Sequence, residues 1–259
     1  MKIPINKILE AYNSVSLKQL DRVSLMKRVD TKFLLSQKDL GSLLHDISSD
    51  YYVLEIEGEK IQKYASVYFD TSQLDFYHNH HNDRVNRIKV RCRKYINTDL
   101  HFLEIKIKNS KGYTDKKRIP VDRLVRNIHK QKAFIHDVTG ENYKLESVLT
   151  NSFNRITLVD KKFTERVTID LNLCYESESN KSDVEGLIVV ELKQSKFDRM
   201  SKIVSTLKEY KSYPYSFSKY CIGMLLTNDN LKHNTFKEKI LKLNKLTDYG
   251  HRYLGNSII

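Results

Sequence analysis

The sequence predicts an α+β protein built on an antiparallel β-barrel or tunnel with helices at its periphery. Three observations predict this class. About eight strand-like runs follow one another along 259 residues, most of them joined by short turns such as Glu57-Gly58-Glu59, as in antiparallel meanders. Helical patterns are inserted between some runs. In several strands, charged side chains occupy one face and aliphatic side chains the other, so a closed sheet would enclose a charged interior.

The first part of the chain alternates predicted helices and strands. A helical pattern covers residues 3–26, and a strand follows over residues 27–35. Ser36 is expected to cap a helix that runs to about Ile47, with Asp39 in its first turn. An amphipathic helix is expected over residues 121–135. Further strands are predicted over residues 51–57, 61–71, 84–95, 100–109 and 112–119.

Three more strands are predicted over residues 153–160, 164–173 and 187–193, the last one opened by Gly186. A helix is expected around residues 197–210. Ser216 or Ser218 is expected to cap a further segment over residues 216–227. We expect one domain over residues 1–259, with a core at about 25–225 and a peripheral C-terminal helix and tail over 228–259.

The composition favours a globular protein with an anionic partner. Hydrophobic residues make up 40% and charged residues 30%, which excludes a disordered chain. Lys and Arg outnumber Asp and Glu by 45 to 32, a net charge of +13, so nucleic acid, a phosphorylated small molecule, polyphosphate or a membrane surface would be attracted. Three dispersed cysteines indicate neither a disulfide framework nor a zinc site. With no signal-like or membrane-spanning segment in the sequence, we expect a cytoplasmic protein.

The strongest functional signal is charge concentrated on single strand faces. In the run over 87–95, one face carries Arg87, Lys89, Arg91 and Arg93, opposite Ile88, Val90 and Cys92. The same alternation recurs in five other strands, whose charged faces carry Arg28, Asp30 and Lys32; Glu104, Lys106 and Lys108; Lys116 and Arg118; Arg166, Thr168 and Asp170; and Glu191 and Lys193. One such face is typically a solvated outer surface, but six would form a basic wall that suits a polyanion.

Two carboxylates lie among these cations. Glu104 and Glu191 share faces with basic residues, so each could form a surface ion pair. The alternative is a divalent metal site, because Mg²⁺ and Mn²⁺ take oxygen ligands from one or two carboxylates together with substrate phosphates. Other polar features predict less. Asp70-Thr71 is expected to shape a turn, and His78, His80 and His81 are expected in a loop.

Eight motifs in order resemble the VTC domain, the polyphosphate polymerase domain of the vacuolar transporter chaperone complex and its bacterial relatives, within the triphosphate tunnel metalloenzymes. They cover about residues 25–225: Arg28-Val29-Asp30-Thr31-Lys32-Phe33, Val67-Tyr68-Phe69-Asp70-Thr71, Lys89-Val90-Arg91-Cys92-Arg93, Leu103-Glu104-Ile105-Lys106, Lys116-Lys117-Arg118, Arg166-Val167-Thr168-Ile169-Asp170, Val190-Glu191-Leu192-Lys193 and Ser216-Phe217-Ser218-Lys219-Tyr220.

The resemblance implies a tunnel that holds the phosphates of ATP, and a metal-dependent phosphotransferase that extends polyphosphate. Glu191, aided by Glu104, would hold Mn²⁺ or Mg²⁺. The residues that would offset charge on the transferring phosphoryl group are Arg91, Arg93, Lys106 and Arg166. The residues that would bind the remaining phosphates are Arg28, Lys32, Lys89, Lys116, Arg118, Lys193, Ser218 and Lys219.

Other functions remain open at this stage. A triphosphatase could use the same scaffold with water as the acceptor, and a module that binds polyphosphate or nucleotide without turnover is a further alternative. The net charge and 16 tyrosines would also suit nucleic acid, but no recognition signature for it is present, so no nucleic-acid partner is expected. The sequence defines neither an oligomeric state nor a partner protein at a membrane.

Overall fold

A computed structural model describes residues 4–20, 28–109 and 114–247. Within these ranges, strands pair in the order β2-β11-β9-β8-β4-β5-β6-β7, and every neighbouring pair on this path is antiparallel. The strands of this path, in chain order, are β2 (Val29–Ser36), β4 (Ile61–Asp70), β5 (Arg87–Tyr95), β6 (Leu100–Lys108), β7 (Thr114–Pro120), β8 (Glu146–Asp160), β9 (Glu165–Glu176) and β11 (Leu187–Gln194).

Three short strands extend the sheet off this path. β1 (Ser14–Val15) pairs with β3 (Tyr51–Leu54) in parallel, β3 also pairs with β8, and β10 (Lys181–Val184) pairs with β9. The sequence did not predict β1 or β10, since each is too short to show an alternating pattern. The other strands confirm the predicted ones with shifted ends, and β8 begins earlier than expected, at Glu146.

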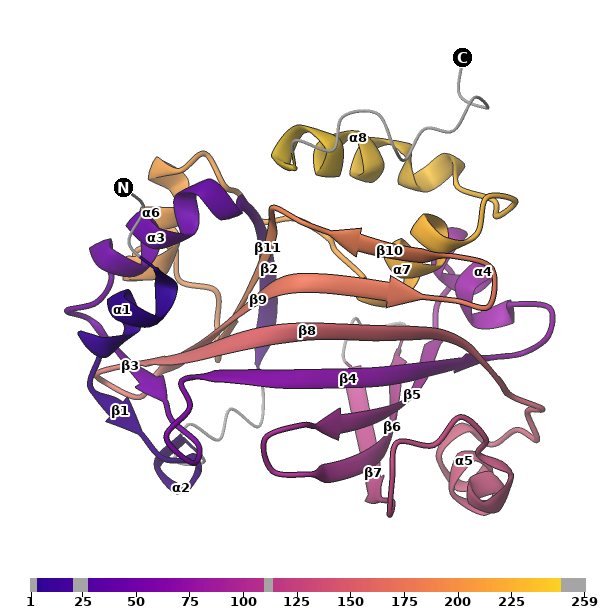
Figure 1. Ribbon diagram of the computed structural model, residues 1–259. Helices are drawn as coiled ribbons and strands as arrows, with labels where there is room; N and C mark the ends of the chain where they lie inside the picture. Colours follow the sequence, from indigo (N-terminus) through magenta and orange to yellow (C-terminus); the bar gives the residue numbers. More distant parts are fainter. Residues whose placement is uncertain (1–3, 21–27, 110–113, 248–259) are drawn as a thin grey trace.

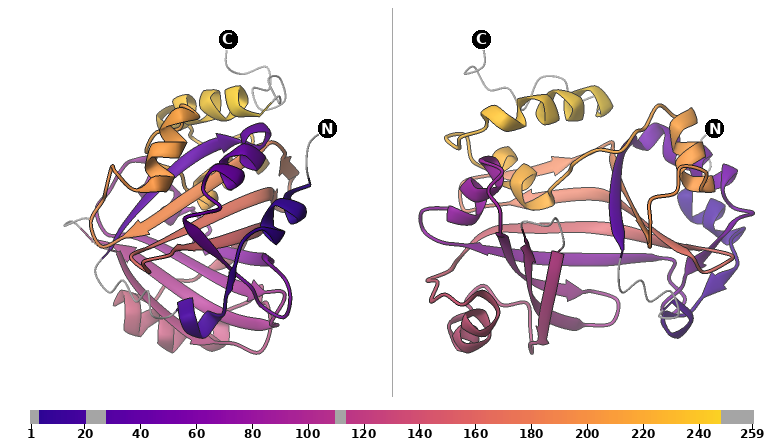
Figure 2. Two further views of the ribbon diagram at one scale, coloured as in Figure 1. Left: turned by 90° about the vertical axis from the view of Figure 1, so that its left-hand side faces the viewer. Right: turned by 180° about the vertical axis from the view of Figure 1, so that it is seen from behind.

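The sheet curls strongly, so that its two edge strands face across an interior. Figures 1 and 2 show β2 and β7 standing steeply against the long strands β4 and β8. Register shifts at Tyr68/Phe69 and at Ser152/Asn154 add local bends to the sheet. No ladder joins β2 to β7 within the described ranges, so the wall is curled rather than closed by hydrogen bonds. The predicted antiparallel tunnel with peripheral helices is confirmed.

Helices cover one end of the sheet through a shared apolar core. This group consists of α1 (Ile5–Glu10), α3 (Gln37–Asp46) and α6 (Lys202–Glu209), seen beside β3 in Figure 1. Leu40 and Leu43 of α3 and Leu207 of α6 are buried against residues of β2, β9 and β11. The Ser36 side chain accepts a hydrogen bond from the Lys38 amide, so the predicted cap of α3 is confirmed.

A second group of helices lies at the opposite end, beside the start of β5. It consists of α4 (Asp75–His81), α7 (Lys219–Thr227) and α8 (Lys237–Leu246), which follows the short turn η2 (Asn234–Phe236). Tyr220 of α7 stacks on Tyr68 of β4 with ring centroids 5.3 Å apart. A Cβ on Gly223 would lie 2.6 Å from a methyl group of Leu149 and would collide with the Tyr175 ring. Only glycine therefore allows α7 to lie this close to the sheet.

Three predicted helices are wrong in extent. The helix expected around residues 197–210 begins only at Lys202, as α6. The segment expected as a helix over 121–135 is irregular until η1 (His129–Gln131) and α5 (Lys132–Thr139). Its backbone bonds to the sheet instead, since the Val121 amide donates to His101 O and Cys92 Sγ to Arg123 O. The helix expected over 3–26 is interrupted by β1 after α1, and only α2 (Leu17–Leu20) follows. Residue 3 and residues 21–26 of that prediction lie outside the described residues.

Asp70 explains why α4 forms where a loop was expected. Its carboxylate accepts hydrogen bonds from the backbone amides of Thr71, Phe76 and Tyr77, and from the Tyr220 hydroxyl. The predicted turn-shaping role is confirmed, and it extends to the first amides of the helix. The C-terminal helix is confirmed as α8, whereas residues 248–259 of the predicted tail lie outside the described part. No helix among the described residues is long and apolar enough to cross a membrane.

Candidate functional site

A cavity of about 730 Å³ lies inside the curled sheet. All eight strands of the main path, or residues directly next to them, contribute side chains to its wall, and the start of α7 contributes Phe217 to Tyr220. Every residue that the sequence nominated for phosphate or metal lines this one cavity: Arg28, Lys32, Lys89, Arg91, Arg93, Glu104, Lys106, Lys116, Arg118, Arg166, Glu191, Lys193, Ser218 and Lys219.

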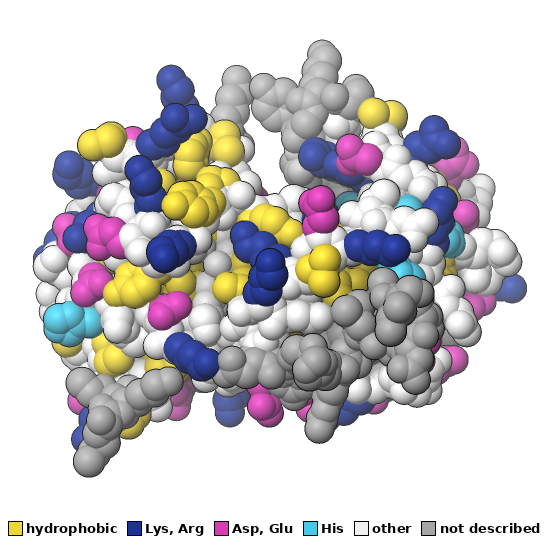
Figure 3. All heavy atoms as spheres, turned by 90° about the horizontal axis from the view of Figure 1, so that it is seen from above, with side chains coloured by type: hydrophobic (Ala, Val, Ile, Leu, Met, Phe, Trp, Pro, Cys, Tyr) yellow, Lys and Arg dark blue, Asp and Glu magenta, His cyan; other side chains and the backbone are white. Residues whose placement is uncertain are grey.

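Strand alternation places these charges inside. On β5 and β6 the residues between the charged ones, such as Cys92 and Ile105, are buried under Ile128 and Ile135 near α5. The apolar faces therefore meet covering helices and loops, while the charged faces meet the cavity. The outer surface differs, because Lys and Arg side chains lie interspersed with Asp and Glu on the face seen in Figure 3.

The cavity wall contains a row of like charges. Lys89, Lys106 and Lys116 lie directly opposite one another across the β5–β6–β7 ladders. Such neighbours repel unless an anion lies between them. Burial and the nearby Arg91 cation lower the pKa of Lys106 well below its usual range, and burial likewise lowers the pKa of Lys89. Neither amine forms an ion pair with a carboxylate among the described residues.

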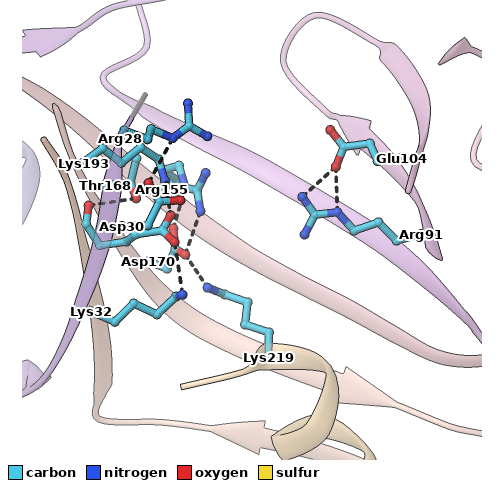
Figure 4. A network of polar contacts seen from close by, with 11 residues as sticks. Arg28, Asp30, Lys32, Arg91, Glu104, Arg155, Thr168, Asp170, Lys193 and Lys219 are labelled. Carbon is cyan, nitrogen blue, oxygen red and sulfur yellow. Dashed lines mark hydrogen bonds and ion pairs between the residues drawn. The ribbon is translucent and has the colours of Figure 1, made fainter. Parts of the chain in front are cut away.

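Glu104 neutralises part of this wall from within the protein. Its side chain is completely buried; Arg91 Nη2 lies 2.6 Å from Oε2, and the Lys116 ammonium contacts Oε1. Although burial opposes ionisation, Arg91, Arg93 and Lys116 hold the pKa of Glu104 far below its ordinary value. Both carboxylate oxygens are therefore engaged, and Glu104 fixes the guanidinium of Arg91 at the cavity wall (Figure 4).

Asp170 forms a second anchor on the other side of the cavity. Arg155 binds it in a bidentate pair with distances of 2.6 and 2.8 Å, and the Lys219 ammonium contacts Oδ2. Figure 4 shows this cluster apart from the Arg91–Glu104 pair. Against the effect of burial, these two cations lower the pKa of Asp170 to about 2. Asp170 thereby ties the first residue of α7 to β8 and β9.

Glu191 is the third carboxylate of the cavity and the least enclosed. Its Oε1 lies 3.3 Å from Lys32 Nζ, its Oε2 contacts the Lys193 ammonium, and the side chain remains 18% exposed. Burial opposes ionisation, but Lys193, Lys32 and Lys106 hold the pKa of Glu191 well below its ordinary value. Glu191 is thus a carboxylate that reaches the cavity and is charged at neutral pH.

The start of α7 brings polar groups to one side of the cavity. Ser218 is the N-cap, and its side chain accepts a hydrogen bond 3.3 Å long from the Cys221 amide. Lys219 lies 4.8 Å from the centroid of the Phe153 ring as well as against Asp170. The positive end of the helix dipole and a lysine therefore act at the same place, which favours anions.

Arg155 is a cavity residue that the sequence analysis missed. It lies 5.1 Å from the Tyr64 ring centroid in addition to its pair with Asp170, and it faces Arg93 across the interior aromatic side chains. The run over 153–160 carries only this basic residue, so it lacked the like-charge alternation that marked other strands. The alternation of Arg155 and Thr157 with Ile156 and Leu158 was the available signal.

A metal site made by the protein alone is not present among the described residues, since no three His, Cys, Asp or Glu side chains gather there. His78, His80 and His81 lie on α4 rather than in the expected loop. Burial, with Lys89, Arg87 and other cations, lowers the pKa of His80 to about 2, so its imidazole is neutral. These histidines do not line the cavity.

Comparison with known proteins shows which family this chain resembles. The family model of the VTC domain matches residues 27–228. Among solved structures, a putative adenylyl cyclase from Hippeastrum, described as having a dominant triphosphatase activity, is similar with 15% identity and a TM-score of 0.48 over 76% of this chain and 94% of its own. A putative adenylate cyclase from Vibrio parahaemolyticus is similar with 9% identity and a TM-score of 0.44 over 76% and 97%.

Among curated proteins, no sequence matches this one. The family match spans the region from just before β2 to the end of α7, which includes every strand of the main path and every charged residue of the cavity. The chain belongs to the VTC domain family.

Proposed function

We propose that this protein is a metal-dependent polyphosphate polymerase, which transfers the terminal phosphoryl group of ATP to a polyphosphate chain inside the cationic cavity. The observation that carries the proposal is an excess of cations over carboxylates in the cavity wall. Lys89 and Lys106 enter the cavity without a carboxylate partner among the described residues, beside Arg91, which Glu104 holds in place. Membership of the VTC domain family supports the same reading.

Some cavity residues would bind phosphate directly, and others hold the phosphate-binding side chains in position. Lys89 and Lys106 would contact phosphate oxygens directly, because neither ammonium forms an ion pair with a carboxylate among the described residues. Arg91 and Arg155 are preorganised by Glu104 and Asp170, so they lose little freedom when a triphosphate binds. Preorganised cations around a transferring phosphoryl group stabilise the charge that develops in the transition state.

The donor set fits one divalent ion at Glu191. Its side chain is 18% exposed in the cavity, whereas those of Glu104 and Asp170 are 0% and 2% exposed. The ion would take the place of the Lys32 and Lys193 ammonium groups that contact the Glu191 oxygens. Mg²⁺ is commonly held by one or two carboxylates together with substrate phosphates, which is the arrangement that a single Glu191 allows. Held by Glu191, such an ion would supply further positive charge to bound phosphates. Glu104 therefore enters this proposal as a residue that positions Arg91, not as a ligand.

The reaction needs no nucleophile from the protein. A terminal oxygen of the polyphosphate chain would attack the γ-phosphorus of ATP in line. The bond from the γ-phosphorus to the β,γ-bridging oxygen would break, and ADP would leave with that oxygen. Water as the attacking group would make the same site a triphosphatase. We propose the phosphate acceptor because the resemblance to the VTC domain implies a polyphosphate polymerase.

A matched pair of lysine variants tests the proposed site. Lys106→Ala removes an unpartnered cation of the cavity, whereas Lys94→Ala removes a lysine of the adjacent strand β5 that pairs with the exposed Asp99 outside the cavity. With ATP and Mn²⁺, we expect Lys106→Ala to lower ADP release by about 100-fold or more and Lys94→Ala to leave it near the wild-type rate. Equal rates for the two variants would remove the cavity from the chemistry.

A further inference from the structure

Asp70 is a completely buried carboxylate at the end of β4 that contacts two helices at once. It accepts hydrogen bonds of 2.9 Å from the Phe76 amide and from the Tyr77 amide, which lie in the first turn of α4. A further hydrogen bond comes from the hydroxyl of Tyr220 in α7, 150 residues later in the chain. α4 and α7 lie side by side at this end of the sheet (Figures 1 and 2).

The capping of α4 explains only part of these contacts. Leu74 is the N-cap residue of α4 and makes no side-chain hydrogen bond there, so the first amides of the helix need another acceptor, which Asp70 supplies. The Tyr220 hydroxyl takes no part in that cap. Because a Tyr220→Phe substitution would keep the ring that stacks on Tyr68, the hydroxyl is not needed for packing.

The Tyr220 hydroxyl completes the hydrogen bonding of the Asp70 carboxylate. Oδ1 accepts from the amides of Thr71 and Phe76, and Oδ2 accepts from the Tyr77 amide and the hydroxyl. Burial raises the pKa of Asp70, and these hydrogen bonds oppose the rise by stabilising the ionised form. Without the hydroxyl, a buried charged acceptor would lose one partner, so the bond constrains the position of Tyr220.

Tyr220 directly follows Lys219, which lines the cavity. The Lys219 ammonium contacts Asp170 Oδ2 and lies 4.8 Å from the centroid of the Phe153 ring. The first turn of α7 is therefore attached to two buried carboxylates, Asp70 through Tyr220 and Asp170 through Lys219. Successive side chains of a helix point about 100° apart, so two such attachments fix both the rotation of α7 and its position along its axis.

We propose that Asp70 is a positioning residue of the phosphate site, which acts through the Tyr220 hydroxyl to hold the Lys219 ammonium in the cavity wall. This inference rests on the proposed function, because it concerns how one of the proposed phosphate-binding lysines is held. Asp70 does not line the cavity and would not contact a bound phosphate. Loss of the hydroxyl would let the first turn of α7 shift, and Lys219 would lose freedom on binding that the native contacts already restrict.

A double-mutant cycle between Tyr220 and Lys219 tests this role. Tyr220→Phe removes the hydroxyl and keeps the ring, whereas Lys219→Met removes the ammonium and keeps most of the aliphatic stem. The matched control is Tyr51→Phe, because the Tyr51 hydroxyl also donates to a buried carboxylate, that of Glu165, and neither residue lines the cavity. The probe is inorganic tripolyphosphate with Mg²⁺, titrated by calorimetry at a temperature at which circular dichroism shows every variant to be folded.

We expect Tyr220→Phe to bind tripolyphosphate about fivefold more weakly than wild type, and Tyr51→Phe to bind it as wild type does. In the Lys219→Met background, Tyr220→Phe should weaken binding by less than about twofold, since the ammonium that it positions is gone. Asp70→Asn should weaken binding by at least as much as Tyr220→Phe does. Adding Tyr220→Phe to Asp70→Asn should then have little further effect, because both changes break the same link.

Two results would contradict the role of Asp70 while leaving the phosphate site intact. Equal losses from Tyr220→Phe in the wild-type and Lys219→Met backgrounds would overturn it, because a purely structural effect does not depend on the ammonium. An undiminished loss from Tyr220→Phe in the Asp70→Asn background would also overturn it, since the hydroxyl would then act without Asp70. Failure of wild type to bind tripolyphosphate would instead overturn the proposed function, and this inference with it.

Discussion

Replacing Glu104 with Gln provides a direct test of how the protein holds its cations. Glu104 is completely buried, and its two oxygens contact the Arg91 guanidinium and the Lys116 ammonium. Glutamine keeps the shape but removes the charge, and its amide N–H₂ would face one of the two cations. The substitution therefore leaves two positive groups in the wall without their internal counter-charge.

The expected cost follows from burial. Removing one partner of a buried ion pair costs about 3 to 5 kcal/mol, because the remaining charge loses its compensation. For a chain of this size each kcal/mol lowers Tm by about 2 to 4 °C, so Glu104→Gln should unfold about 6 to 20 °C below wild type. Bound tripolyphosphate would supply the missing negative charge, and its addition should raise Tm more in the variant than in wild type.

Thermal unfolding followed by circular dichroism measures both effects. Asp99→Asn is the matched control, because Asp99 forms an exposed pair with Lys94 at the tip of the same hairpin, and exposed pairs contribute less than about 1 kcal/mol. A Glu104→Gln variant that melts within about 2 °C of Asp99→Asn, with and without tripolyphosphate, would show that Glu104 is not the counter-charge that Arg91 and Lys116 need.

Three further predictions concern pH and packing. Because burial and Arg91 lower the pKa of Lys106, tripolyphosphate affinity should fall as alkaline pH removes its charge, and Lys106→Arg should abolish that fall in a calorimetric titration. The pKa values of Asp170 and Glu191 are lowered by cations, so the stability they contribute is present above about pH 5 and lost toward pH 2; urea unfolding at stepped pH should show this loss, and Asp170→Asn should reduce it. Gly223→Ala should displace α7 and weaken tripolyphosphate binding together with Tm, whereas an unchanged Tm would contradict the close packing on Leu149 and Tyr175.

The charged strand faces were predictable because alternation along a strand is a local property. Arg91 and Lys106 sit in strands whose neighbours on both sides are aliphatic, so their parity and hence their side of the sheet followed from residue type alone. The same argument placed Glu191 and Lys193 on the cavity side. Curling of the sheet then brought these faces together.

The ion pairs that side chains form between different strands were not predictable in this way. The pair between Arg155 and Asp170 depends on the register of β8 against β9, and the contact from Lys219 depends on where α7 packs. Likewise, the difference in exposure between the buried Glu104 and the more open Glu191 depends on which cations lie opposite each of them. Single-strand patterns contain no register, so they do not distinguish these roles.

The predicted bounds of helices were wrong where tertiary contacts outweighed the local spacing of apolar residues. Leu124, Val125 and Ile128 have helical spacing, yet they pack on the β5–β6 sheet from an irregular segment. In contrast, α4 forms in a stretch rich in His and Asn because Asp70, at the end of β4, accepts hydrogen bonds from its first amides. Both outcomes arise from bonds to distant elements, which residue spacing does not reveal.

The proposed reaction is the transfer of phosphoryl groups from ATP to a phosphate chain inside the cavity. The most direct measurement is ³¹P NMR of the products after incubation with ATP and Mn²⁺, with and without a short polyphosphate primer, and with Glu191→Gln as the inactive comparison. A growing signal of internal chain phosphates together with ADP, lost in Glu191→Gln, is the predicted result. Orthophosphate and ADP without chain growth would contradict the polymerase and identify water as the acceptor.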